Sequence, residues 1–273
     1  MKWDGHTHTE FCPHGSREEV ERFIIRAIEL GFDTYSVTEH MPLPAHFNQQ
    51  AAGEREAYET ASMAMSDLPY YLKEMARLRA KYRSDLKIKI GFEVDYLAQF
   101  EAFTRDFLNE YGPELDDGIL SVHFLEGQDG IRSIDFSAAD YKTGIVDFYG
   151  GFREAQIAYL EQIKASILAD LGAFKPKRLG HISLCQKFRH AFNTETALPD
   201  DVMTDVLELV QRSGYALDYN TAGLFKVDCR ATYPPEMYVK QAKHLGIPLV
   251  YGSDSHAVRD VGRAYSVFSE NLS

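Results

Sequence analysis

Apolar positions along the chain form short runs that alternate with stretches of helical spacing. Seven such runs predict strands, at residues 2–6, 33–38, 87–93, 118–123, 178–182, 215–219 and 247–252. Apolar residues three and four positions apart predict intervening helices, over 68–82, 97–110, 151–171, 200–213 and from Pro234 to Gly246. Repeated strand–helix units without a break in composition favour α/β architecture in a single domain over 1–273, as a closed or nearly closed parallel barrel of the TIM type. A doubly wound open sheet is the structural alternative.

Local signals frame the first helix, and two long segments interrupt the alternation. Ser16 and Glu19 have the spacing of a capping box, which predicts a helix start there, and Gly31 suits a left-handed helix end. Residues 41–65 and 126–150 are predicted excursions from the barrel, either lids or ordinary surface loops. The tail after residue 257 is short.

Composition narrows the classes of function. The 273 residues are 45% apolar, enough for a large core, and no run of about 18 uncharged apolar residues predicts a membrane span. The first residues lack the apolar stretch of a signal peptide, so a cytoplasmic protein is expected. A net charge of −12 disfavours nucleic acid as a partner. The cysteines show no disulfide framework, although Cys12 lies within the proposed ligand segment; they are Cys12, Cys185 and Cys229.

Residues with metal-ligand chemistry gather where the predicted strands end. His6 and His8 are two residues apart, a spacing that places both imidazoles on one face of a strand. Asp4 could orient one of these imidazoles by a hydrogen bond. Because the carboxyl ends of barrel strands meet at one face, further candidates are expected beside them: His14, His40, Glu93, His123, His181, Asp254 and His256.

These candidates are expected to differ in role. Glu39 and His40 are adjacent on a strand and point in opposite directions, so His40 is the predicted ligand and Glu39 a partner that orients a ligand. Glu93 is the predicted bridge between two ions because a carboxylate has two oxygens. A single histidine is more often a hydrogen-bonded core residue, and chance would scatter such residues among helices and loops, as with His46, His190 and His244.

Together these motifs resemble the polymerase-and-histidinol-phosphatase (PHP) superfamily over essentially the whole chain. Gly91–Tyr96 and Ser121–Leu125 are similar to its histidinol-phosphatase branch. The resemblance implies a distorted (β/α)7 barrel with three divalent ions. It assigns the first ion to His6, His8, Glu93 and Asp254, the second to Glu93, His123 and His181, and the third to His14, His40 and His256.

The resemblance also implies an activity, the metal-dependent hydrolysis of L-histidinol phosphate to L-histidinol and phosphate in histidine biosynthesis. Bound ions would activate water and neutralise phosphate oxygens. The resemblance places phosphate-binding arginines in the regions of Arg153 and Arg189, and the reserves are Lys187, Arg230 and Arg263. Asp254 or a water molecule is the candidate proton donor to the leaving group.

Two other functions stay open. The same chemistry could act on another phosphomonoester, such as a nucleotide, an oligonucleotide 3′ end or phosphotyrosine. A noncatalytic metal-binding domain is the second alternative. Nitrogen and oxygen ligands accept zinc, iron and manganese, so the sequence leaves the metal open, as it does the oligomeric state.

Overall fold

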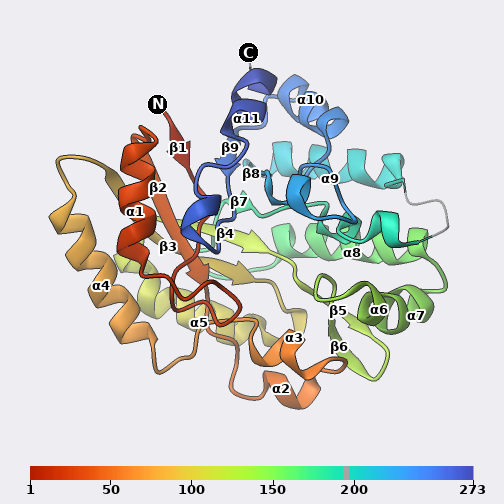
Figure 1. Cartoon of the computed structure of the whole chain (residues 1–273). Coiled ribbons are helices and arrows are strands. Elements are labelled where there is room, and N and C mark those ends of the chain that lie inside the picture. The colour runs from red at the N-terminus through yellow and green to blue at the C-terminus, as the bar shows by residue number, and fades with distance from the viewer. Residues whose placement is uncertain (193–196, 273) are drawn as a thin grey trace.

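The computed structural model describes residues 1–192 and 197–272, and it shows a barrel of seven parallel strands (Figure 1). Neighbouring strands follow the order β1–β2–β3–β4–β7–β8–β9. Gly5 N–H donates to the Tyr251 carbonyl (2.8 Å), and Thr7 forms a parallel β-bridge with Ser255, so the first and last strands meet. The predicted barrel is thereby confirmed and the open sheet is excluded. The strand bounds are β1 Trp3–Asp4, β2 Thr34–His40, β3 Lys87–Asp95, β4 Asp117–Ser121, β7 Arg178–Leu179, β8 Ala216–Asn220 and β9 Leu249–Gly252.

Helices surround the barrel and return the chain from one strand to the next (Figure 1). Each packs an apolar stripe inward; in the first helix, Phe23, Ile24 and Ala27 are buried. The helices that connect or follow barrel strands are α1 Val20–Glu29, α4 Leu68–Lys81, α5 Glu101–Tyr111, α8 Phe152–Leu168, α9 Asp200–Arg212, α10 Glu236–His244 and α11 Tyr265–Leu272.

One local prediction for the first helix is wrong and another is confirmed. The capping box is wrong: α1 begins at Val20, whose N–H donates to Glu10 (2.7 Å), Glu19 makes no capping bond, and the Ser16 hydroxyl bonds with Glu18. The predicted left-handed end at Gly31 is confirmed by its φ of +70°. The tail also holds the helix α11, whose Phe268 is buried against the barrel.

The two excursions pack against each other over one end of the barrel. The first contains α2 (Phe47–Gln50) and α3 (Arg55–Glu59), and the second contains α6 (Ala138–Tyr141) and α7 (Asp147–Tyr149). A hairpin of β5 (Phe124–Gly127) and β6 (Gly130–Ser133) leads into the second excursion. Ala52 N–H donates to the Ile131 carbonyl (2.8 Å), and Phe47 packs on Phe124. The excursions are therefore structured walls at this end.

The opposite end of the barrel is closed by a buried arginine. Arg178 donates to the Gly5 carbonyl (2.6 Å) and pairs with Asp117 (3.1 Å). The guanidinium also lies over the Trp3 ring. None of the described helices is both long and apolar enough to cross a membrane.

Candidate metal centre

The structure brings all nine predicted ligand groups together at the carboxyl ends of the barrel strands. Seven imidazoles form one continuous cluster, with ring centroids 4.0 Å apart for His8 and His256 and 4.2 Å apart for His8 and His40. His6 and His8 lie 5.3 Å apart on the same side, as their spacing predicted. The cluster is thus assembled from both ends of the chain and several strands between them.

Glu93, two residues before the end of β3, lies at the centre of this cluster. Its Oε1 atom is 2.8 Å from His181 Nε2 and accepts a hydrogen bond from the Ser121 hydroxyl (2.6 Å). Its Oε2 atom is 3.2 Å from His6 Nε2 and 3.5 Å from His8 Nε2. The two oxygens therefore face different imidazole groups, which is the geometry required of a bridging carboxylate.

Two imidazole pairs face one another through their Nε2 atoms. The Nε2 atoms of His14 and His256 are 3.0 Å apart. Their Nδ1 atoms lie beside the carbonyl oxygens of Thr60 (2.9 Å) and Asp254 (3.1 Å), which require N–H at those positions. Two lone pairs at this distance repel unless a cation lies between them. Nitrogen ligands about 2.1 Å from one ion lie roughly 3.0–3.4 Å apart, so the pair fits a shared metal.

A second pair also approaches through Nε2 atoms, and its His181 Nε2 lies 2.8 Å from Glu93 Oε1 as well. The Nε2 atoms of His123 and His181 are 3.1 Å apart, and the Asp95 carboxylate accepts from His123 Nδ1 (2.8 Å). Several inward-facing atoms also have no hydrogen-bond partner within the described part of the chain. They are His6 Nε2, His8 Nε2, both ring nitrogens of His40, and Glu93 Oε2. Buried polar atoms are rarely left unpaired, so these donor atoms fit cation ligands.

Acidic residues outside the cluster fix which imidazole nitrogen faces inward. Asp218, on β8, accepts from His6 Nδ1 (2.7 Å), and Glu39 lies 3.3 Å from His8 Nδ1. Glu39 therefore has its predicted position beside a ligand. Asp4 does not have its predicted contact: its carboxylate accepts from Ser253 N–H (3.0 Å), and among the described residues it bonds to no imidazole ring.

Asp218 is the main site residue that the sequence analysis missed. It stands two residues before Asn220 in a buried strand, and that polar spacing could have revealed it. Asn220 Nδ2 donates to both Asp218 and Asp254, at 3.1 Å each. Gly252 allows the approach, because a Cβ there would collide with the Asp218 carboxylate and with His6.

Asp254 reaches the cluster through an unusual backbone conformation. It follows β9 with a φ of +52°, a region that residues with side chains seldom adopt. Its N–H donates to the His6 carbonyl (2.9 Å), and its Oδ1 lies 3.3 Å from His8 Nε2. The backbone strain thus aims a carboxylate at the imidazoles.

The carboxylates set the proton affinities of the imidazoles. Burial opposes charge on His6, but Glu93 and Asp218 outweigh it and raise its pKa well above the ordinary value. By the same balance, the nearby carboxylates of Asp254 (3.3 Å), Glu39 and Glu93 outweigh burial and raise the pKa of His8 to about 9. Burial dominates at His40 and lowers its pKa well below the ordinary value. The cluster therefore contains imidazoles whose affinity for a proton is raised by carboxylates, and other imidazoles that stay neutral.

A cavity of about 310 Å³ opens onto the cluster. Its walls include three basic side chains, Lys187, Lys226 and Arg263. They also include three acidic side chains, Glu56, Asp135 and Asp260. Lys187 and Asp135 form an ion pair (3.0 Å), and Arg263 donates to the Ser253 carbonyl (3.2 Å) next to Asp254. An anion and a cation could therefore bind at different parts of one cavity.

The two arginines chosen from the resemblance do not line this cavity in the described structure. Arg153, at the start of α8, is half exposed and faces Asp201 of α9 (3.8 Å). Arg189 turns away and donates to the Cys229 carbonyl (2.8 Å). Of the reserves, Lys187 and Arg263 reach the cavity, whereas Arg230 donates to the Val227 carbonyl. Sequence position alone could not show which way these side chains turn.

Comparison with known proteins gives relatives along the whole chain. The PHP domain model matches residues 4–222, and a PHP-associated model matches residues 237–273. A histidinol-phosphatase of Bacillus subtilis is 38% identical over 271 residues, covering 99% of each chain. A crystal structure from Listeria monocytogenes, of a protein to which a histidinol-phosphatase function is ascribed, is 61% identical. Its TM-score is 0.95, with 98% of this chain and 100% of that chain covered.

A more distant structure shares the fold. Histidinol phosphate phosphatase from Lactococcus lactis, solved with zinc, L-histidinol and phosphate, has a TM-score of 0.72 at 19% identity. The comparison covers 99% of this chain and 93% of that one. The second matched model, over 237–273, contains β9, the seventh barrel strand, so both matched regions contribute to one barrel.

Proposed function

The chain belongs to the PHP domain family, and from this premise we propose that it hydrolyses L-histidinol phosphate to L-histidinol and phosphate in histidine biosynthesis. The observation that carries the substrate is the end-to-end similarity, at 38% identity, to the Bacillus subtilis histidinol-phosphatase. The zinc, L-histidinol and phosphate in the Lactococcus lactis structure agree with it. The chemistry is that of a metal-dependent phosphomonoesterase.

Three divalent ions fit the inward-facing donor atoms. The first would be held by His6, His8, Glu93 and Asp254, the second by Glu93, His123 and His181, and the third by His14, His40 and His256. The opposed Nε2 pairs and the unpartnered buried nitrogens support this assignment. Bound zinc, iron or manganese would lower the pKa of water and neutralise the phosphate oxygens.

Protons are expected to compete with ions for this centre, so zinc affinity should rise with pH. The pKa is about 9 for His8 and about 10 for His123, where burial is outweighed by Asp254 and Asp95 respectively. Below these values each imidazole must release a proton before its nitrogen binds an ion. One proton displaced per ion gives about a tenfold gain in affinity per pH unit. Chelator competition at about pH 6.5, 7.5 and 8.5 measures it, and an affinity independent of pH would contradict it.

The basic side chains of the cavity are proposed to bind the phosphate group, and Arg153 and Arg189 remain the candidates that the resemblance implies for the same role. Lys187, Lys226 and Arg263 line the same cavity as the ligand cluster. Burial, and then repulsion from Lys187, lowers the pKa of Lys226. Phosphate oxygens would relieve this repulsion.

The acidic side chains of the cavity, together with Phe136, are proposed to bind the leaving alcohol. Histidinol carries an ammonium group and an imidazole, which suit Glu56, Asp135 and Asp260 by charge and Phe136 by ring contact. Of the two candidate proton donors to the leaving group, a water molecule is proposed over Asp254. Burial alone would raise the pKa of Asp254, but His6 and His8 hold it well below the ordinary value, so Asp254 is a poor proton donor.

Truncation of one cavity lysine separates the two phosphate assignments. Lys226→Ala is expected to raise KM about tenfold with little change in kcat, because it removes a charge that binds the phosphate in both ground and transition states. Lys226→Arg should keep most of the affinity. Arg153→Ala, at an exposed position outside the cavity, is the matched control and should leave KM unchanged. A large KM effect at Arg153 and none at Lys226 would return the role to the arginine.

A panel of phosphomonoesters tests the proposed substrate. Steady-state kcat/KM should be highest for L-histidinol phosphate, above nucleotides, an oligonucleotide with a 3′ phosphate, and phosphotyrosine. The acidic balance of the chain supports a small-molecule substrate over polymeric nucleic acid. If kcat/KM for another ester exceeds that for L-histidinol phosphate by orders of magnitude, the proposed substrate is wrong, but the proposed metal-dependent hydrolysis of a phosphomonoester is retained. If no ester is hydrolysed in the presence of metal, the chain is a noncatalytic metal-binding domain.

A further inference from the structure

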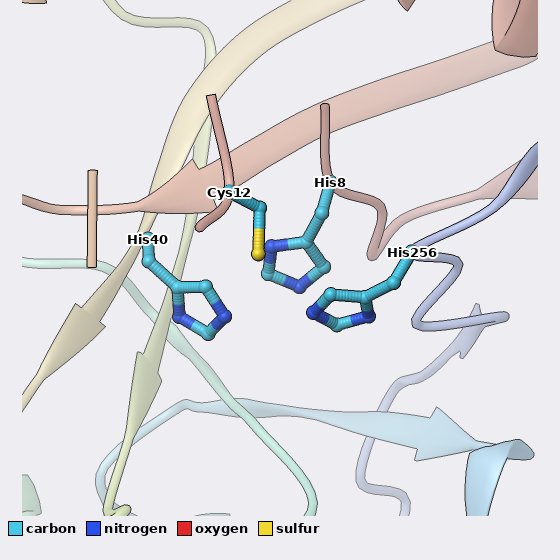
Figure 2. Close-up of side chains that lie close together, drawn as sticks. All are labelled: His8, Cys12, His40 and His256. Atoms are coloured by element: carbon cyan, nitrogen blue, oxygen red, sulfur yellow. The ribbon is translucent and has the colours of Figure 1, made fainter. Parts of the chain in front are cut away.

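A buried cysteine lies among the imidazoles of the centre. Figure 2 shows the Cys12 sulfur directed between the rings of His8 and His40, with His256 beside them. One potential ligand atom from each of these four residues lies within 4.8 Å of the others. Cys12 has no exposed surface, and it is on the turn that leads to His14.

The atoms that surround this sulfur have the character of ligands. His40 is 5% exposed, and neither of its ring nitrogens has a hydrogen-bond partner within the described residues. His8 and His256 supply the other two ligand atoms of the group. A buried imidazole with both nitrogens unpartnered is costly unless a cation lies beside it.

Cys229 differs from Cys12, since its thiol donates to the Ala231 carbonyl (3.6 Å) like an ordinary buried cysteine. The Cys12 sulfur lies instead among imidazole rings (Figure 2).

We propose that Cys12 is a sulfur ligand, together with His40 and His256, for one ion of the centre, and that this position selects zinc or another thiophilic divalent ion. Thiolate with imidazole suits zinc, cobalt and iron(II), whereas manganese and magnesium prefer oxygen. On binding, the sulfur donates an electron pair to the ion and the thiol proton passes to solvent. This inference takes from the proposed function only that the centre binds a metal ion.

Cobalt(II) spectroscopy tests the sulfur–metal bond without reference to turnover. The full-length protein loaded with cobalt is expected to show a near-ultraviolet thiolate-to-cobalt charge-transfer band. Cys12→Ala should abolish the band and weaken zinc retention against a chelator by at least about tenfold at one site. Cys12→Ser, close in size to cysteine, should also lack the band, and circular dichroism checks that both variants fold.

A complementary variant leaves Cys12 untouched. Because the chain has three cysteines, the double change Cys185→Ala with Cys229→Ala leaves Cys12 as its only sulfhydryl. The band should persist in this protein. Absence of the band there, or its survival in Cys12→Ala, overturns the proposal. Phosphatase assays of the same samples report separately on the proposed function, which can fail while the band is present, or hold while it is absent.

Discussion

Replacement of Glu93 by glutamine is expected to reduce kcat/KM for phosphate release to less than about one thousandth of the unaltered value. The amide keeps the shape of the side chain but carries no charge and offers one acceptor oxygen in place of two. In the structure those two oxygens face His181 on one side and His6 and His8 on the other. Glutamine cannot satisfy both sides, so the ions on either side should bind less tightly.

The measurements are steady-state kinetics and metal content on the same preparation. Metal content should fall in Glu93→Gln, and excess zinc should not restore the rate. Ser121→Ala is the matched control, because it removes the hydroxyl that donates to Glu93 and leaves the carboxylate in place. Its loss of activity should be far smaller. A metal-loaded Glu93→Gln protein with an unaltered rate would contradict the bridging role.

The barrel and most of its site were accessible from the sequence because both depend on short-range patterns. Strand runs separated by helical spacing predict parallel strands, and parallel strands in a barrel place their carboxyl ends at one face. His6 with His8 follows the two-residue period of a strand, and the structure keeps them on one side. His40 ends β2, and Glu93, two residues before the end of the neighbouring strand β3, is its register partner. Convergence of these groups therefore follows from topology.

The parts that failed depend on contacts between distant segments. Asp218 could not be assigned to His6 from sequence because the two are 212 residues apart and meet only across the closed barrel. Asp4, two residues from His6, was the nearer but wrong choice, since its carboxylate turns to Ser253. Arg153 and Arg189 stay predictions as phosphate ligands; in the structure their side chains contact Asp201 of α9 and the Cys229 carbonyl, partners that the sequence alone does not reveal. Ser16 failed as a cap because its hydroxyl bonds with Glu18.

Replacement of Asp218 by asparagine should weaken binding of the ion held by His6 by about 10- to 100-fold. The carboxylate accepts from His6 Nδ1, which keeps the proton on that nitrogen and leaves the Nε2 lone pair directed at Glu93. An amide of the same size can still accept one hydrogen bond, but it lacks the charge that makes His6 a strong donor to a cation. It also disturbs the contact from Asn220, which in turn holds Asp254.

The loss in Asp218→Asn should therefore be one of ion affinity, and excess zinc should recover much of kcat, unlike in Glu93→Gln. Chelator competition gives the affinity, and kcat/KM with and without added zinc gives the recovery. Asp117→Asn is the control for removing a carboxylate from the barrel interior: it loses its pair with Arg178 at the opposite end. That variant should lower the melting temperature without changing zinc affinity. An Asp218→Asn protein that folds and retains zinc as tightly as the unaltered chain would show that His6 needs no acidic partner, and the orientation of this imidazole would then rest on the packing of β1 against β9 alone.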